Sequence, residues 1–149
     1  MQLEKPVSAV MSINFLWLPA TATVEQAVQL FLQHKPSFLP VLSEDKKRVL
    51  GVVEPLDLLS AKDSKASITS CMQASFPKVY SDDNLVAVLR AFRQHKKLYA
   101  VVLDKYTEIP VGVVTVVDVL ASLPELAEYF LPFVDLSRKF RVEENGEVP

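Results

Sequence analysis

The segment that decides the fold is Gly112-Val-Val-Thr115-Val-Val-Asp118, an apolar run that ends in a small polar residue with an acid three positions later. A run of valines is typical of a short buried strand. Thr115 can cap the first turn of a following helix, and Asp118 can favour the positive end of that helix. The sequence therefore predicts a strand that turns directly into a helix. Capping alone explains part of this pattern.

The same segment occurs once more, 61 positions earlier, as Gly51-Val-Val-Glu54-Pro-Leu-Asp57. At this offset residues 7–61 align with residues 68–122 without a gap, and 13 of the 55 pairs are identical. A single period of this length indicates one supersecondary unit used twice. The chain then divides into a lead (1–6), a first repeat (7–61), a polar linker (62–67), a second repeat (68–123) and a C-terminal helix with a polar tail (124–149).

Each repeat is predicted to be mixed α/β. Apolar residues at helical spacing predict helices at Val24–His34, capped by Thr23 with Gln26, and at Leu85–His95, capped by Asn84. Further patterns predict strands at 38–42, 49–53, 99–103 and 111–114, and helices at 55–61 and 116–123. One repeat is too small to bury its own apolar face, so we expect the two to pack together about a pseudo-twofold axis.

The segment after the second repeat leaves two interpretations open. Residues 124–136 are apolar and helix-like, and residues 138–149 are polar and acidic. The simpler interpretation is a helix that caps its own module, followed by a frayed tail. The other is a docking helix for a partner or a second subunit.

Composition limits the class of protein. The chain has 149 residues, 50% of them hydrophobic, and a net charge of −2, which is ordinary for a globular protein and gives no general attraction to nucleic acid or anionic lipid. No apolar run reaches the ~18 residues of a membrane span, and the start lacks the features of a secretory signal. The single cysteine, Cys71, cannot form an internal disulfide. We therefore expect a cytoplasmic protein without membrane insertion.

Patterns typical of catalysis are absent from the sequence. It has no metal-ligand spacing, no glycine-rich phosphate loop and no nucleophile elbow. His34 and His95 are repeat equivalents at helix ends, where an imidazolium complements the last carbonyls. Asp57 and Asp118 are also repeat equivalents, so we expect them at separate sites and not as an acid–base pair. We expect no enzyme activity and no metal requirement.

The junction offers a binding site beside its capping role. A carboxylate at Asp118 can accept both hydroxyls of a ribose, while Thr115 and the helix N–H groups can meet a phosphate.

The twofold repeat and its Gly-x-x-Thr-x-x-Asp junction resemble the CBS domain pair, or Bateman module, over residues 7–123. Segments 33–42 and 97–103 are similar to the strand that precedes the glycine in that family. The resemblance implies two β-α-β-β-α repeats and a regulatory module, not an enzyme. It also implies an adenosyl ligand (AMP, ADP, ATP or S-adenosylmethionine) in clefts between the repeats, a homodimer, and an effector protein of unknown identity.

Carried over residue by residue, the resemblance implies two ligand sites. The principal site comprises Thr115, Val117 and Asp118 together with Met11, Ser12, Leu16, Ser37 and Phe38. The second, weaker site comprises Asp57 together with Met72, Gln73, Pro77, Leu98 and Tyr99.

The two sites differ in charge. Glu54 stands where the family prefers Ser or Thr, and a carboxylate ~4 Å from a phosphate charge costs about 4 kcal/mol at an effective dielectric near 20. Pro55 also removes an N–H from the helix start. We therefore expect the Thr115–Asp118 site to be the competent one. A ligand-free structural or protein-interaction module is the alternative, and a ligand that raises the melting temperature distinguishes the two.

Overall fold

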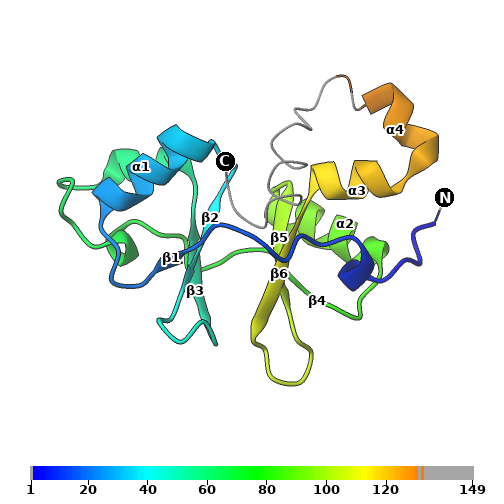
Figure 1. The fold of residues 1–149 in the computed structure, drawn as a ribbon, viewed down its shortest axis with the longest axis horizontal. Coiled ribbons are helices and arrows are strands. Elements are labelled where there is room, and N and C mark those ends of the chain that lie inside the picture. The colour runs from blue at the N-terminus through cyan, green and yellow to red at the C-terminus, as the bar shows by residue number, and fades with distance from the viewer. Residues whose placement is uncertain (1, 131, 133–149) are drawn as a thin grey trace. The chain divides into compact units, whose positions relative to one another are not determined.

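The computed structural model describes residues 2–130 and 132, which divide into two compact units (Figure 1). The first unit is Leu16–Phe76. The second unit joins the chain up to Phe15 with the chain from Pro77 onward. Each unit therefore combines most of one repeat with the opening residues of the other repeat.

The first unit is a three-stranded sheet with one α-helix. Its elements are β1 (Leu18–Pro19), α1 (Val24–His34), β2 (Leu39–Leu42), β3 (Val49–Val53) and the 3-10 helices η2 (Pro55–Ser60) and η3 (Ile68–Ser70). The central strand β2 runs parallel to β1 and antiparallel to β3.

The second unit repeats this order and these strand directions. Its elements are η1 (Val7–Ala9), β4 (Lys78–Tyr80), α2 (Leu85–His95), β5 (Tyr99–Leu103), β6 (Pro110–Thr115), α3 (Val116–Ser122) and α4 (Pro124–Phe130). The mixed α/β fold predicted from the sequence is confirmed.

The helices α1 and α2 begin and end at the predicted residues. Thr23 and Gln26 form a reciprocal capping box, with N···O distances of 2.9 and 3.3 Å. The Ala87 N–H donates to the side chain of Asn84 at 3.2 Å. Each helix ends at a lysine in the left-handed conformation, Lys35 and Lys96. Local sequence therefore sets both ends of these helices.

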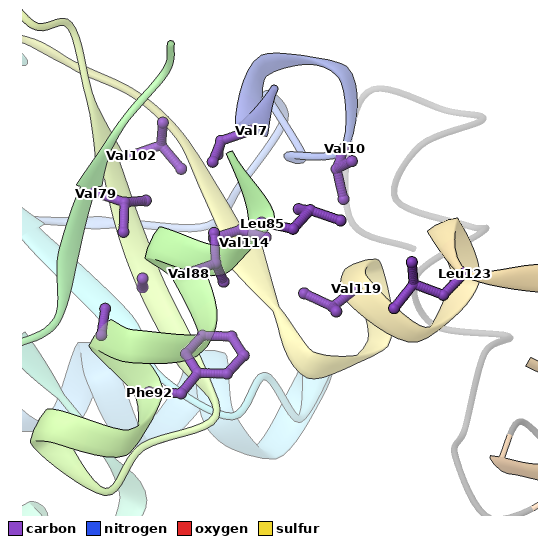
Figure 2. Packing of buried hydrophobic residues seen from close by; sticks show 12 residues of the cluster. Val7, Val10, Val79, Leu85, Val88, Phe92, Val102, Val114, Val119 and Leu123 are labelled. Carbon is purple, nitrogen blue, oxygen red and sulfur yellow. The ribbon is translucent and has the colours of Figure 1, made fainter. Parts of the chain in front are cut away.

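A continuous apolar core holds the second unit together (Figure 2). Its buried side chains come from the strands, from α2 and α3 and from the opening residues of the chain: Val7, Val10, Val79, Leu85, Val88, Ala91, Phe92, Ala100, Val102, Val114, Val119 and Leu123. The first unit has an equivalent core that includes Ile68, the repeat counterpart of Val7, and both of these side chains are fully buried.

The opening residues of each repeat are thus anchored in the unit that holds the other repeat. The Val7 N–H donates to the carbonyl of Asp83 at 2.7 Å, and the Ile68 N–H donates to the carbonyl of Ala22 at 2.9 Å. Figure 1 shows the dark-blue start of the chain beside α2. Buried apolar area and paired backbone groups both favour this exchange.

Several elements differ from the sequence prediction. Residues 55–60 form a 3-10 helix within the helix predicted at 55–61. The strands β1 and β4 are the first strands of the two β-α-β-β-α repeats that the resemblance implies, but they are too short for a periodic pattern to locate them. Helix α4 covers the first half of the expected helix 124–136. Apart from residue 132, the rest of that helix and the tail 138–149 lie outside the described residues.

Helix α4 packs partly against the core of its unit and is partly exposed. Leu126 packs against the core of the second unit, and Tyr129 is 66% exposed. Among the described residues, no helix has both the length and the apolar character that a membrane crossing requires.

Candidate functional site

At the junction between β6 and α3, several hydrogen bonds converge on Asp118. Its Oδ2 accepts from the Thr115 backbone N–H at 2.8 Å and from the Thr115 hydroxyl at 3.2 Å. The Asp118 N–H donates to Thr115 Oγ1 at 3.4 Å, which completes a capping box. The capping role predicted for these two residues is therefore present in the structure.

Asp118 is the one charged side chain among the described residues that is buried, with 2% of its surface exposed. Its second oxygen, Oδ1, accepts from the hydroxyl of Ser12 at 3.3 Å. A buried carboxylate needs such donors because transfer out of water is costly. Three residues of the expected principal site, Ser12, Thr115 and Asp118, are thus brought together within the second unit.

Backbone pairing brings Ser12 to this position. Ser12 and Val113 exchange two backbone hydrogen bonds, at 2.8 and 3.0 Å. A Cβ on Gly112 would lie 2.8 Å from the sulfur of Met11 and 3.0 Å from the Ser12 carbonyl oxygen. The glycine is therefore required by the close approach of the Met11–Ser12 segment.

The junction after β3 repeats this geometry in the first unit. Val52 and Gln73 exchange two backbone hydrogen bonds, at 2.8 and 3.0 Å. A Cβ on Gly51 would lie 2.6 Å from the carbonyl oxygen of Gln73 and 2.9 Å from the sulfur of Met72. Met72 and Gln73 therefore occupy the places that Met11 and Ser12 occupy in the second unit.

The side chains at this junction are different. Asp57 Oδ2 accepts from the Glu54 N–H at 2.7 Å and from the Gln73 side-chain amide at 2.8 Å. The same Gln73 nitrogen also donates to Glu54 Oε2 at 3.2 Å. One amide thus bridges two carboxylates, and both are only half-buried.

The remaining expected site residues are divided between the units. Met11 and Val117 lie in the second unit with Ser12, Thr115 and Asp118, and Met72 and Gln73 lie in the first unit with Asp57. Of the other six, the first unit holds Leu16, Ser37 and Phe38, and the second holds Pro77, Leu98 and Tyr99.

The structure also shows which N–H groups at the start of α3 have partners. The Val116 N–H donates to the carbonyl of Leu98 at 2.9 Å, and the Asp118 N–H donates to Thr115. No local pattern in the sequence signals this contact, and the resemblance implies Leu98 at the second site. Phosphate binding by these two groups would require breaking bonds that the chain already makes.

The remaining candidate groups among the described residues are one thiol and two imidazoles. Burial, and then the nearby Asp57 charge, raise the pKa of the Cys71 thiol, which makes it a weak nucleophile. A ring nitrogen of His95 lies 3.3 Å from the Ala91 carbonyl oxygen, and the Nδ1 atom of His34 is buried without a hydrogen-bond partner in the described part of the chain. No cluster of three or more potential metal ligands occurs within residues 2–130.

Comparisons with known proteins agree on the family. The model of the CBS domain matches twice, at residues 7–64 and 67–125. UPF0053 protein Rv2366c of Mycobacterium tuberculosis is 28% identical over 141 residues, which are 87% of this chain and 32% of the relative. The chain thus spans about a third of the length of the first curated relatives it matches.

Uncharacterized protein MJ1004 of Methanocaldococcus jannaschii is 32% identical over 126 residues, which are 82% of this chain and 58% of that protein. Its crystal structure aligns with a TM-score of 0.73 at 26% identity, over 96% of this chain and 79% of that one. The CBS domain of the bacterial CNNM/CorC family Mg²⁺ transporter, solved in complex with ATP, aligns with a TM-score of 0.69 at 27% identity, over 79% of this chain and 86% of that one.

Proposed function

Because the chain belongs to the CBS domain family, we propose that it is a regulatory module, not an enzyme, and that it binds an adenosyl ligand at the Thr115–Asp118 junction. Asp118 would accept the ribose hydroxyls. Ser12, Met11 and Val117 would form the rest of the site within the second unit. Participation of Leu16, Ser37 and Phe38 from the first unit stays a prediction of the resemblance.

The observation that carries this proposal is the set of donors around Asp118. Among the described residues, Ser12 and Thr115 each donate a side-chain hydroxyl to its carboxylate. A hydroxyl can donate or accept by rotating its proton. The two hydroxyls can therefore turn from the carboxylate towards a ligand, and a ribose diol can take their place on the charged oxygens.

The ligand class rests on the adenosine part and not on phosphate. ATP is bound by the related CBS domain of the CNNM/CorC transporter. The Val116 N–H at the start of α3 already donates to the carbonyl of Leu98, so a phosphate would have to displace that bond. We therefore propose that AMP, ADP, ATP and S-adenosylmethionine are all recognised through the ribose. Titration of each ligand ranks their affinities.

The test is titration calorimetry of the four ligands against the parent chain, Asp118→Asn and the matched control Asp57→Asn. Asparagine keeps an oxygen for the Thr115 N–H but removes the charge, so the helix cap is retained. We expect Asp118→Asn to weaken binding by about 2–3 kcal/mol, or about 30–150-fold, and Asp57→Asn to leave it unchanged. Equal affinity of the parent and Asp118→Asn would remove Asp118 from the site.

A ligand-free interaction module is the second function to test, because exposed leucines on η2 favour it. Leu56 and Leu59 on η2 are 77% and 80% exposed, whereas their repeat equivalents on α3, Val117 and Leu120, are half-buried. We propose that the chain signals through a second copy or an effector protein. Light scattering with and without ATP tests the homodimer, and a monomer at all concentrations in both conditions would exclude it.

A further inference from the structure

We propose that the side-chain amide of Gln73 closes the first-unit junction to ribose, so that the chain takes one adenosyl ligand and not two. This inference rests on the proposed function, because it concerns the repeat equivalent of the Asp118 site. Gln73 would act as an internal occupant of the position that a ribose diol takes at Asp118.

The contacts at Asp57 place two donors on one of its carboxylate oxygens. Asp57 Oδ2 already accepts two hydrogen bonds, from the Glu54 N–H at 2.7 Å and from Gln73 Nε2 at 2.8 Å. Asp118 Oδ2 also accepts two hydrogen bonds, so the number of bonds does not distinguish the two aspartates. The difference lies in the donor, because a ribose hydroxyl has to displace an amide at Asp57 and meets the hydroxyls of Thr115 and Ser12 at Asp118.

The nature of the donor makes this closure persistent. The amide nitrogen of Gln73 can only donate, and its second contact, to Glu54 Oε2 at 3.2 Å, holds it between two negative charges. If the Gln73 amide turned so that its oxygen faced inward, that oxygen would lie against both carboxylates and be repelled by them. Ser12, at the equivalent position in the second unit, makes one contact of 3.3 Å through a hydroxyl that is free to rotate.

The charge of Glu54 offers a competing explanation, and an uncharged ligand separates the two. Repulsion by Glu54 acts on a phosphate, so it predicts that adenosine binds both junctions while ATP binds one. Closure by Gln73 acts on the ribose, so it predicts that adenosine also binds at the Asp118 junction alone. Adenosine and ATP are therefore the two probes.

The glycines provide a reporter at each junction. Gly112 lies against Met11 and Ser12, and Gly51 lies against Met72 and Gln73. The chain has one further glycine, so the two backbone amides are readily assigned in a ¹H–¹⁵N correlation spectrum. Titration of the full chain then shows which junction each probe reaches.

In the parent chain we expect both probes to shift the Gly112 amide and to leave the Gly51 amide unchanged. In Gln73→Ala we expect adenosine to shift Gly51 as well, because the ribose hydroxyls can replace the lost donor. In Ser12→Gln, which transfers the closing residue, we expect the affinity at Gly112 to fall about tenfold or more. The dispersion of the remaining amide signals reports whether each variant is folded.

The outcomes separate the two proposals. A parent chain in which adenosine shifts both glycines would overturn the closure by Gln73 while the proposed function stands. A folded Gln73→Ala in which Gly51 stays unchanged, or a folded Ser12→Gln with parental affinity, would also overturn it. A parent chain in which neither glycine responds to either probe would overturn the proposed function, and the inference with it.

Discussion

The two strand-to-helix junctions share one backbone arrangement and differ in chemistry. In both, a glycine leaves room for a crossing segment, which is Met11–Ser12 in the second unit and Met72–Gln73 in the first. This crossing segment pairs with the strand, and an aspartate accepts the N–H of the residue that precedes the helix. The hydroxyls of Ser12 and Thr115 donate to Asp118, whereas a side-chain amide that Gln73 shares with Glu54 donates to Asp57. Backbone geometry is therefore common to both repeats, and the difference in chemistry comes from single side chains.

The largest effect on stability is expected where the two glycines are compared. An added Cβ at Gly51 meets a backbone oxygen at 2.6 Å, while at Gly112 its nearest neighbour is the flexible side chain of Met11. We expect Gly51→Ala to cost about 3 kcal/mol of unfolding free energy and Gly112→Ala about 1 kcal/mol. Urea denaturation of both variants measures this. Equal costs would show that the crossing segments yield equally at the two junctions.

A smaller effect is expected where the two aspartates are compared. Asp118→Ala leaves the Thr115 N–H and the Ser12 hydroxyl without their acceptor at a buried site, which costs about 2 kcal/mol. Asp57→Ala affects a half-buried site where water can replace the lost oxygen, so we expect about 1 kcal/mol or less. Urea midpoints of the two variants give the order, and the reverse order would contradict the difference in burial.

The smallest effect is expected at the hairpin turns, where an aspartate plays the same part in each unit. The Ser43 hydroxyl and then the Lys47 N–H lower the pKa of Asp45, and the Thr107 and Tyr106 N–H groups lower the pKa of Asp104. A lowered pKa in the folded state means that the stabilisation is present above the ordinary value of 3.8 and is lost as the pH falls below it.

We therefore expect Asp45→Asn and Asp104→Asn each to flatten the acid side of the stability curve below about pH 4 and to leave its neutral side with a similar slope. Urea midpoints measured from pH 7 downwards check this. A variant that keeps the full acid dependence of the parent would show that its turn aspartate is not linked to folding.

Much of the fold follows from short-range pattern. The bounds of α1 and α2, the capping box of Thr23 and Gln26 and the Asn84 cap were predicted correctly because the interacting groups lie within one helical turn. Periodicity did not locate the strands β1 and β4 or the 3-10 helices η1 and η3, because each is only two or three residues long. Pairing with β2 and β5 defines the two strands, and the 3-10 helices are single turns, such as the bond from the Val10 N–H to the Val7 carbonyl.

The site shows the same division. The importance of Thr115 and Asp118 as a cap could be predicted from their spacing, and the difference at Glu54 and Pro55 was visible in the repeat alignment. The partners of the two aspartates could not be predicted from local pattern. Leu98, which the resemblance implies at the second site, accepts from the start of α3, and no local pattern signals that backbone contact.

The sequence by itself determined the duplication, the mixed α/β pattern, the two long helices and the strand-to-helix junctions, because each depends on periodicity or on hydrogen bonds between near neighbours. Only the tertiary structure decided that the opening residues of each repeat join the unit of the other repeat. It thereby brought Ser12 into hydrogen-bond contact with Asp118, which is 106 positions away in the sequence, and Gln73 into contact with Asp57. These contacts follow from the burial of apolar residues such as Val7 and Ile68. Burial of an apolar side chain fixes the position of its segment, but it does not specify which neighbouring side chain reaches a distant carboxylate.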